Sequence, residues 1–462
     1  MRNTGILVFI FALIFSGTLA YKAESYIDCL RINSNSPEAD KNYCKNELAK
    51  IEAELQVLLN KQKEQQKQTG TIQGDVNYLN SQINALQTKV KARSLAIAQL
   101  KISINEKTNK IGTLSEKIKR EHASLADLLR NTNEFDNDNM VHILLSDGSI
   151  SDFYSNIESY SSVRRAVKNS IDIIRGIRNE TEIEKSELQK KQDAETDARA
   201  ELEASKKKVA QTEAEKKQLL AVSKQKEGEY QKLAAEKRAQ AEKIRSALFS
   251  LAGTSQKIEF GTALQYALEA QKITGVDPAF LLAVITQESN LGANVGQCYL
   301  KNKETGAGVG KNTGTPFANT MKPMGLAGRK GDVDDFIAIT AKLGLNWETT
   351  AISCPIAGVA GYGGAMGPAQ FIPTTWKLFE TRLRNTLGYD ANPWVARDAF
   401  LASAMYLTDL GAVGNSYSAQ MKAACRYYGT GGTSCSYGKS VLSIKARIQG
   451  DIDYINQYGA PR

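Results

Sequence analysis

The sequence predicts a mainly all-α protein in which a long antiparallel coiled-coil hairpin is followed by a compact helical domain. Proline gives the first indication: none occurs between Pro37 and Pro278, whereas seven lie from Pro278 to Pro393. Glycine divides the chain in the same way, with 8 of 35 up to residue 246 and 27 beyond it. Proline breaks helices and glycine weakens them, so the first half can be helical almost throughout.

The charge and histidine content limit the possible functions. The 462 residues include 59 Lys and Arg against 50 Asp and Glu, which gives a net charge of +9. This favours an anionic partner such as nucleic acid, acidic lipid or a cell-wall polymer, without choosing among them. The two histidines are His122 and His142, so residues 143–462 contain none. A Ser-His or Cys-His nucleophile and a His-ligated zinc site are therefore excluded there.

The N-terminus has the pattern of a secretory signal. An apolar run at residues 6–15 precedes small residues and a cleavage site after Ala20, so residues 1–20 are predicted to be removed. The alternative is an uncleaved anchor, although the run is shorter than the ~20 residues that a membrane span needs. Either way, the protein is expected to be exported to the periplasm, cell wall or extracellular space.

Six cysteines in an exported chain predict disulfide bonds. Cys29 and Cys44 are expected to pair in the segment that leads into the first helix. A bond between Cys425 and Cys435 would close a short loop and leave Cys298 with Cys354. Four cysteines in the second half allow three connectivities, so these last two pairs stay open.

Residues 21–246 carry the pattern of a coiled coil. Apolar residues alternate at spacings of four and three, and this seam is interrupted at Arg93, Lys107 and Glu121. It begins with Ile72, Val76, Leu79, Ile83, Leu86 and Val90. A polar break at residues 131–139 and a resumption after residue 160 predict a hairpin whose tip spans about 131–160. Each arm of roughly 85 residues would extend about 130 Å. The alternative is a parallel homodimer of one long rod.

An apolar segment, residues 140–145, lies between the arms and is followed by Ser-Ile-Ser-Asp-Phe at residues 149–153. Over residues 40–245 this pattern resembles the coiled-coil hairpins of bacterial cell-wall hydrolases and hydrolase activators that act at the division septum. The resemblance implies that the hairpin is a regulatory device that docks a membrane or septal protein through its tip. The alternative is that these apolar residues only cover the end of the hairpin.

The second half, residues 247–462, contains a helix that ends at an acid. Asp277 is a predicted N-cap with Pro278 at the first helical position, and Gly292 stops the helix just after Glu288. Burial and the negative end of the helix dipole should both raise the pKa of Glu288. A carboxylic acid that stays protonated near neutral pH can donate a proton to a glycosidic oxygen.

Three further motifs follow in order. They are Gly-Ala-Met-Gly-x-x-Gln-Phe-x-Pro at residues 364–373, Asn-Pro at 392–393 with Asp-Ala-x-x-x-x-Ala-x-Tyr-Leu at 398–407, and Arg-Tyr at 426–427. Together with Glu-Ser-x-x-Gly at 288–292, they resemble the lytic transglycosylases, most closely the membrane-bound B-type branch. The resemblance covers about residues 255–450 and implies a fold similar to goose-type lysozyme.

The resemblance also implies roles for individual residues. Glu288 matches the catalytic acid and base, Tyr362 and Gln370 match glycan-contacting positions, and Tyr427 matches an aromatic residue that lines the cleft. Ser289, Gly364 and Met366 lie in the same motifs and complete the predicted substrate-binding set. One position departs from the pattern: Gly361 stands where relatives often carry a serine, which puts the hydroxyl assistance to ring closure in doubt.

The implied reaction cleaves peptidoglycan glycan strands between N-acetylmuramic acid and N-acetylglucosamine and forms a 1,6-anhydro ring. It uses one carboxyl group, in contrast to two-carboxyl glycosidases. It needs no metal or cofactor, and the anionic partner is then the glycan strand rather than nucleic acid. Asp332, Asp334 and Asp335 lack the spacing of a calcium loop and are expected to form a solvated acidic loop.

Three alternatives remain to be weighed. A peptide-cleaving wall hydrolase would need histidine in the second half, which has none. A non-catalytic adaptor would recruit or activate another hydrolase without needing Glu288. A hydrolytic muramidase would need a second carboxylate, for which Glu348, Asp390 and Asp398 are available. The 68 residues from 293 to 360 are expected to be an irregular insert of unassigned role.

Overall fold

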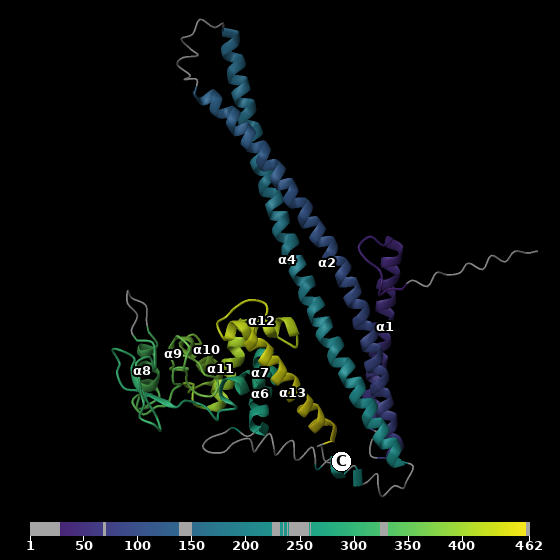
Figure 1. Cartoon of the computed structure of the whole chain (residues 1–462), viewed down its shortest axis with the longest axis vertical. Helices are drawn as coiled ribbons and strands as arrows, with labels where there is room; N and C mark the ends of the chain where they lie inside the picture. Colours follow the sequence, from purple (N-terminus) through teal and green to yellow (C-terminus); the bar gives the residue numbers. More distant parts are fainter. Residues whose placement is uncertain are drawn as a thin grey trace, which may run out of the picture.

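The structure, a computed structural model, describes residues 28–67, 71–137, 150–223, 232–233, 235–237, 239, 258, 260–323 and 331–458. It is mainly helical, as predicted. A hairpin of two long helices rises from a base on which the compact domain is docked (Figure 1). The predicted signal, residues 1–20, and the turn at the hairpin tip lie outside the described residues.

The hairpin consists of α2 (Ile72–Asn137) and α4 (Ile150–Ser223), which pack against each other in opposite directions. Helices of 66 and 74 residues extend about 100–110 Å. They run well into the predicted tip, because residues 131–137 and 150–160 are helical. Extending an existing helix requires no new nucleation, so the polar residues near 131 do not end it.

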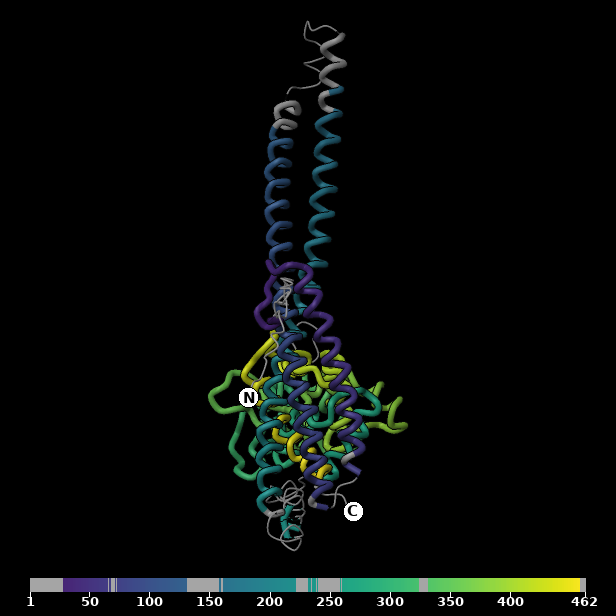
Figure 2. Tube along the Cα trace, turned by 90° about the vertical axis from the view of Figure 1, so that its right-hand side faces the viewer, coloured from purple at the N-terminus to yellow at the C-terminus, as the bar shows by residue number. Residues whose placement is uncertain are grey.

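A third helix, α1 (Glu38–Gln66), packs against the lower part of α2 and was not expected from the seam. The Cys29–Cys44 disulfide bond packs with Ile51, Ala92 and Leu95 at this contact. Lys41 of α1 also pairs with Glu106 of α2 at 2.8 Å. Figure 2 shows that only α2 and α4 continue beyond α1. The base of the hairpin is therefore thicker than its distal part.

Each polar interruption of the seam meets a polar partner on α4. Arg93 pairs with Glu201, and Lys107 pairs with the buried Glu184 at 2.8 Å. Glu121 accepts a hydrogen bond from Ser170 at 3.4 Å. Because each of these side chains loses its partner when the helices slide, the interruptions fix the register of the hairpin.

The compact domain has one hydrophobic core, drawn from residues 260–448. Its central helix is α7 (Pro278–Ser289), in which every residue from 279 to 285 is buried. The other elements are α6 (Phe260–Thr274), β1 (Cys298–Leu300), β2 (Gly308–Gly310), β3 (Pro316–Phe317), α8 (Asp332–Lys342), α9 (Pro373–Lys377), α10 (Glu380–Leu387), α11 (Ala396–Asp409), α12 (Tyr417–Tyr427) and α13 (Ser436–Tyr458).

The insert at residues 293–360 is not irregular, in contrast to the expectation. It contains an antiparallel sheet in the order β1-β2-β3, with Cys298 opposite Gly310, and then helix α8. The expected solvated acidic loop is also wrong, because Asp332, Asp334 and Asp335 form the first turn of α8. Asp332 is buried and accepts hydrogen bonds from the backbone and hydroxyl of Thr374 at 3.1 and 2.7 Å. Acids are stabilised at a helix N-terminus by its dipole.

All three expected disulfide bonds are present: Cys29–Cys44, Cys298–Cys354 and Cys425–Cys435. Such bonds form and persist in oxidising compartments, so they indicate that the protein is exported. Within the part of the chain that the structure describes, no helix has the length and apolar character required to cross a membrane.

The core around α7 should be sensitive to lost volume. Leu282 is fully buried, so Leu282→Ala should lower the free energy of unfolding by about 2–5 kcal/mol. Leu268→Ala is the matched control, because Leu268 is 43% exposed and its truncation should change stability by less than about 0.5 kcal/mol. Urea unfolding followed by tryptophan fluorescence reports on the compact domain, which holds Trp347, Trp376 and Trp394. If Leu282→Ala and Leu268→Ala lowered the free energy of unfolding equally, this would contradict the central position of α7.

Candidate active site around Glu288

Local sequence fixes where α7 begins and ends. The carboxylate of Asp277 accepts a hydrogen bond from the backbone of Phe280 at 2.8 Å, and Pro278 occupies the first turn, as predicted. The helix ends at Ser289, because Asn290 and Leu291 adopt left-handed conformations with φ of 50° and 54°. Glu288 therefore lies in the last turn of a helix whose preceding turns are buried.

The surroundings of Glu288 favour its protonated form. Burial raises the pKa of Glu288 to about 7, and a hydrogen bond donated by the Tyr437 hydroxyl to Oε1 opposes this rise. Glu288 is thus a half-buried acid, and among the described residues it has one hydrogen-bond partner, Tyr437, which stabilises its ionised form. Near neutral pH it can both give and take a proton.

Tyr437 lies at the start of α13 and was assigned no role from the sequence. Its ring stacks on Tyr428, with ring centroids 4.8 Å apart and an interplanar angle of 14°. Burial and then the charge of Glu288 raise the pKa of Tyr437, so its hydroxyl stays a donor. The only signal in the sequence was its position two residues after Cys435.

Tyr427 ends α12 and lies near the same acid, and its predicted place in a substrate cleft stays a prediction. Its hydroxyl donates to the carbonyl of Ala369 at 2.9 Å and lies 3.4 Å from the hydroxyl of Ser403. Burial, followed by the charge of Glu288, raises the pKa of Tyr427 well above its ordinary value. Glu288, Tyr427 and Tyr437 therefore come together from three helices.

Ser289 and Met366, like Gly364, are buried members of the predicted substrate-binding set. Ser289 donates a hydrogen bond to the carbonyl of Pro368 at 2.6 Å and accepts one from the backbone of Gly292 at 2.9 Å. Met366 is fully buried, and its backbone pairs with Phe371 at 2.9 Å. The structure thus gives both residues positioning roles between α7 and the glycine-rich segment, and their predicted contact with a glycan stays a prediction.

Gly364 and Gln370 belong to the same glycine-rich segment and have left-handed backbones. Gly364 has φ of 92°, and a Cβ there would lie 3.1 Å from the Met321 side chain, so a larger residue is disfavoured. Gln370 adopts φ of 51°, which is uncommon for a residue with a side chain. Its amide donates to the carbonyl of Gly367 at 2.8 Å. This bond holds the Gln370 amide within the turn.

Tyr362 is 52% exposed and lies on a loop that the insert supports. The side-chain amide of Asn319 donates a hydrogen bond to the carbonyl of Gly361. The backbone carbonyl of Asn319 accepts one from the backbone N–H of Gly363 at 3.2 Å. Ser353 accepts two further hydrogen bonds, both at 2.9 Å. Its backbone carbonyl accepts from the N–H of Gly364, and its hydroxyl accepts from the N–H of Ala365. The insert therefore supports the loop that carries Tyr362 and Gly364.

Of the three carboxylates proposed as partners for a hydrolytic reaction, two are held by other residues and the third is exposed. Asp398 is buried and accepts from the Tyr389 hydroxyl at 2.7 Å and the Asn392 backbone at 2.9 Å. Asp390 pairs with Lys342 at 3.1 Å and with Arg384 at 2.5 Å. Glu348 is exposed. Among the described residues, no group of His, Cys, Asp and Glu is arranged to hold a metal ion.

Comparison of the chain with protein-family models, with curated proteins and with solved structures finds no match. The functional interpretation therefore depends on the geometry around Glu288.

Glu288→Gln should stabilise the protein only at higher pH. The pKa is raised from 4.5 to about 7 on folding, so below pH 4.5 the acid is protonated in both states and costs nothing. Above pH 7 it is ionised in both states, and its burial costs on the order of 3 kcal/mol. Urea unfolding should show Glu288→Gln more stable than wild type at pH 8 and equal at pH 4. Glu304→Gln, at an exposed glutamate, is the control. If the difference in stability between Glu288→Gln and wild type were the same at pH 8 and at pH 4, this would contradict the burial of Glu288.

Tyr437→Phe should raise the pKa of Glu288 further. The substitution keeps the ring and the burial but removes the hydroxyl that stabilises the carboxylate. A ¹³C NMR titration of labelled glutamate, with the Glu288 signal identified by its loss in Glu288→Gln, measures the change. Tyr428→Phe keeps the stacked ring and should leave the titration unchanged. A lower pKa in Tyr437→Phe would show that this hydrogen bond is not the main polar contact.

Proposed function

We propose that the protein is a peptidoglycan lytic transglycosylase in which Glu288 is the single acid and base. The observation that carries this proposal is a half-buried carboxyl group whose pKa is raised to about 7 and whose one hydrogen-bond partner among the described residues is the hydroxyl of Tyr437. Such a group is protonated in a large fraction of molecules at neutral pH. It meets the requirement for general acid catalysis on a glycosidic oxygen.

In the proposed reaction, protonated Glu288 donates its proton to the oxygen between N-acetylmuramic acid and N-acetylglucosamine. The C1–O bond breaks and N-acetylglucosamine leaves as an alcohol. The carboxylate of Glu288, which accepts the Tyr437 hydrogen bond, then takes the proton from the muramoyl C6 hydroxyl. That oxygen attacks C1 and closes the 1,6-anhydro ring, so Glu288 ends in its starting state. The acetamido group of the substrate can stabilise the intermediate.

Two exposed aromatic rings suit a sugar chain. Tyr428 is 57% exposed and stacks on Tyr437, the partner of Glu288, and Tyr362 is 52% exposed on the glycine-rich loop. Exposed aromatic faces can stack on the apolar faces of sugar rings and pay little entropy on binding. Gln370 would supply an amide for a polar contact with the glycan.

A hydrolytic muramidase is disfavoured by the carboxylates around the site. Burial and Tyr437 are the influences on the pKa of Glu288, and no second acid is among them within the described residues. Asp390 and Asp398 are held by other partners, which leaves them poorly placed to orient a water molecule. One-carboxyl chemistry is therefore the better fit.

The setting of this reaction would be the cell envelope. Export and a net charge of +9 both suit an anionic wall polymer. We place the protein in the periplasm, cell wall or extracellular space, with an N-terminal anchor as a finer alternative. The hairpin tip would then dock a membrane or septal protein, and residues 138–149 of this tip lie outside the described part of the chain.

The test is digestion of purified peptidoglycan by the full-length protein and by Glu288→Gln, with product masses read by mass spectrometry. Wild type should release anhydro-muropeptides, and the variant should reduce their rate by at least about a thousandfold. The rate should fall as pH rises through about 7, where Glu288 loses its proton. Glu304→Gln serves as the matched control, because it makes the same change at an exposed loop.

The product masses separate the alternatives. Products heavier by one water molecule would identify a muramidase. Binding to peptidoglycan without cleavage, in both wild type and Glu288→Gln, would identify an adaptor and overturn the proposal.

A further inference from the structure

The two helices that bring tyrosines to Glu288 also reach the coiled-coil hairpin. α12 ends at Tyr427 and α13 begins at Ser436, one residue before Tyr437. The first turn of α12 packs against α4, and the last turns of α13 lie at the base of the hairpin (Figure 1). Each helix thus has one end at the acid and the other end on the hairpin.

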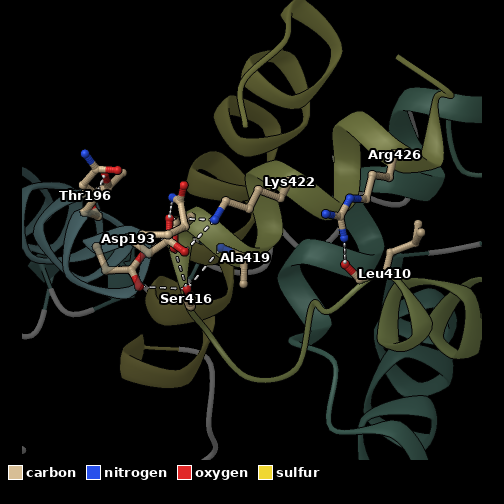
Figure 3. Close-up of polar contacts among 11 residues, drawn as sticks. Asp193, Thr196, Leu410, Ser416, Ala419, Lys422 and Arg426 are labelled. Carbon is tan, nitrogen blue, oxygen red and sulfur yellow. Dashed lines mark hydrogen bonds and ion pairs between the residues drawn. The ribbon is translucent and has the colours of Figure 1, made fainter. Parts of the chain in front are cut away.

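The contact of α12 with the hairpin is polar and closely fitted (Figure 3). Asp197 of α4 accepts hydrogen bonds from the Ser416 hydroxyl at 2.8 Å and from the Ser418 backbone at 2.7 Å. Ser416 is itself the N-cap of α12 and accepts from Ala419 at 3.2 Å. Asp197 therefore extends the cap of α12 and supplies a partner for a backbone donor of its first turn.

A second acid strengthens the same contact. Asp193 lies one turn before Asp197 on α4, and both of its oxygens pair with the ammonium of Lys422, at 2.5 and 2.6 Å. The side chains of Lys422 and Asp193 are 20% and 32% exposed. A partly buried pair of this kind is screened less by solvent than a surface pair. Two acids on α4 thus hold α12 at two points.

The other ends of the two helices are tied together at the acid. The Cys425–Cys435 disulfide bond joins the last turn of α12 to the residue that precedes α13. Gly438 packs against this bond, because a Cβ there would lie 3.0 Å from the sulfur of Cys425. α13 meets the hairpin at its far end, where Asp453, Asn456 and Gln457 line a pocket together with Tyr78 and Gln82 of α2 and Lys208 of α4. α13 runs back along α12, since Lys445 of α13 donates to the side-chain carbonyl of Gln420 in the first turn of α12 at 2.7 Å.

We propose that Asp193 and Asp197 are positioning residues for the reaction of Glu288, so that the hairpin completes the active site of the compact domain. This inference rests on the proposed function. By fixing the first turn of α12, the two acids fix Tyr427, and through the disulfide bond they fix Tyr437 against the carboxyl group. The groups that face Glu288 from these helices are Tyr427 on α12 and Tyr437 on α13. The groups that face the two acids are Lys422, Ser416 and Ser418.

Release of α12 from the hairpin has a defined chemical effect. When Tyr427 and Tyr437 move away, water reaches Glu288 and its pKa falls, because burial is the larger influence on it. A smaller fraction of the acid is then protonated at neutral pH. The expected change is a lower kcat with a shifted pH profile rather than loss of binding.

The experiment uses charge reversal in the full-length protein. Lys422→Asp and Asp193→Lys each break the pair, and the double variant Asp193→Lys with Lys422→Asp restores it with the signs exchanged. Glu182→Lys makes the same charge change on α4 at a position whose side chain is 73% exposed and pairs with Lys185 of its own helix. Release of anhydro-muropeptides from peptidoglycan is measured across pH, with kcat and KM separated on a soluble glycan fragment. A ¹³C titration of Glu288 gives a readout that does not depend on activity.

Each single reversal should lower kcat about tenfold with KM changed less than about threefold, and should move the alkaline fall in rate to lower pH. The double variant and Glu182→Lys should match wild type within about threefold. Unchanged kcat and pH profile in the single reversals would overturn the inference, and increased activity would show that the hairpin restrains the enzyme. If wild type forms no anhydro products, the proposed function fails. The ¹³C titration then decides whether the single reversals lower the pKa of Glu288, as positioning requires.

Discussion

The burial of one carboxyl group, Glu288, is the constraint on which the rest of the compact domain depends. Its helix, α7, is anchored by apolar residues that are all buried from 279 to 285, so the position of its last turn is fixed by the core. Ser289, the next residue, ties that turn to Pro368 of the glycine-rich segment. Folding places an acid where its charge is disfavoured, and the stability of the core offsets this cost.

An acid that acts as both proton donor and acceptor must be able to ionise as well as to stay protonated. Tyr437 makes the ionised form of Glu288 accessible. Its hydroxyl donates to the carboxyl group and stabilises the ionised form in a place that water reaches poorly. The balance between burial and this single bond leaves the pKa at about 7 rather than far above it. The residues that set the balance come from α12 and α13, more than a hundred positions after Glu288.

Those features that depend on neighbouring residues were predictable, and those that depend on distant contacts were not. Asp277 and Pro278 mark a helix start by their own chemistry, and alternating spacings of three and four mark a coiled coil. Helix α1 carries a seam of its own, with Cys44, Leu48, Ile51 and Leu55 spaced four, three and four apart, but the spacing does not tell which helix it packs against. The bond from Tyr437 to Glu288 spans 149 positions, and the bonds from Asn319 and Ser353 to the glycine-rich loop come from an insert whose sheet and helix the sequence did not reveal. The three acids of α8 were misassigned because Asp332 meets Thr374 only in the folded chain.

The polar interruptions of the coiled-coil seam also affect the compact domain, because they fix the part of α4 that holds α12. Lys107 and Lys110 hold Glu184 on one side of Asp193 and Asp197, and Lys89 and Arg93 hold Glu201 on the other. The two acids that hold α12 therefore lie within a stretch of α4 whose register is fixed at both ends. If α4 slid by one turn, about 5.4 Å, these charged groups would separate together with the contact to α12. The same ion pairs that align the hairpin thus determine where α12 is held relative to Glu288.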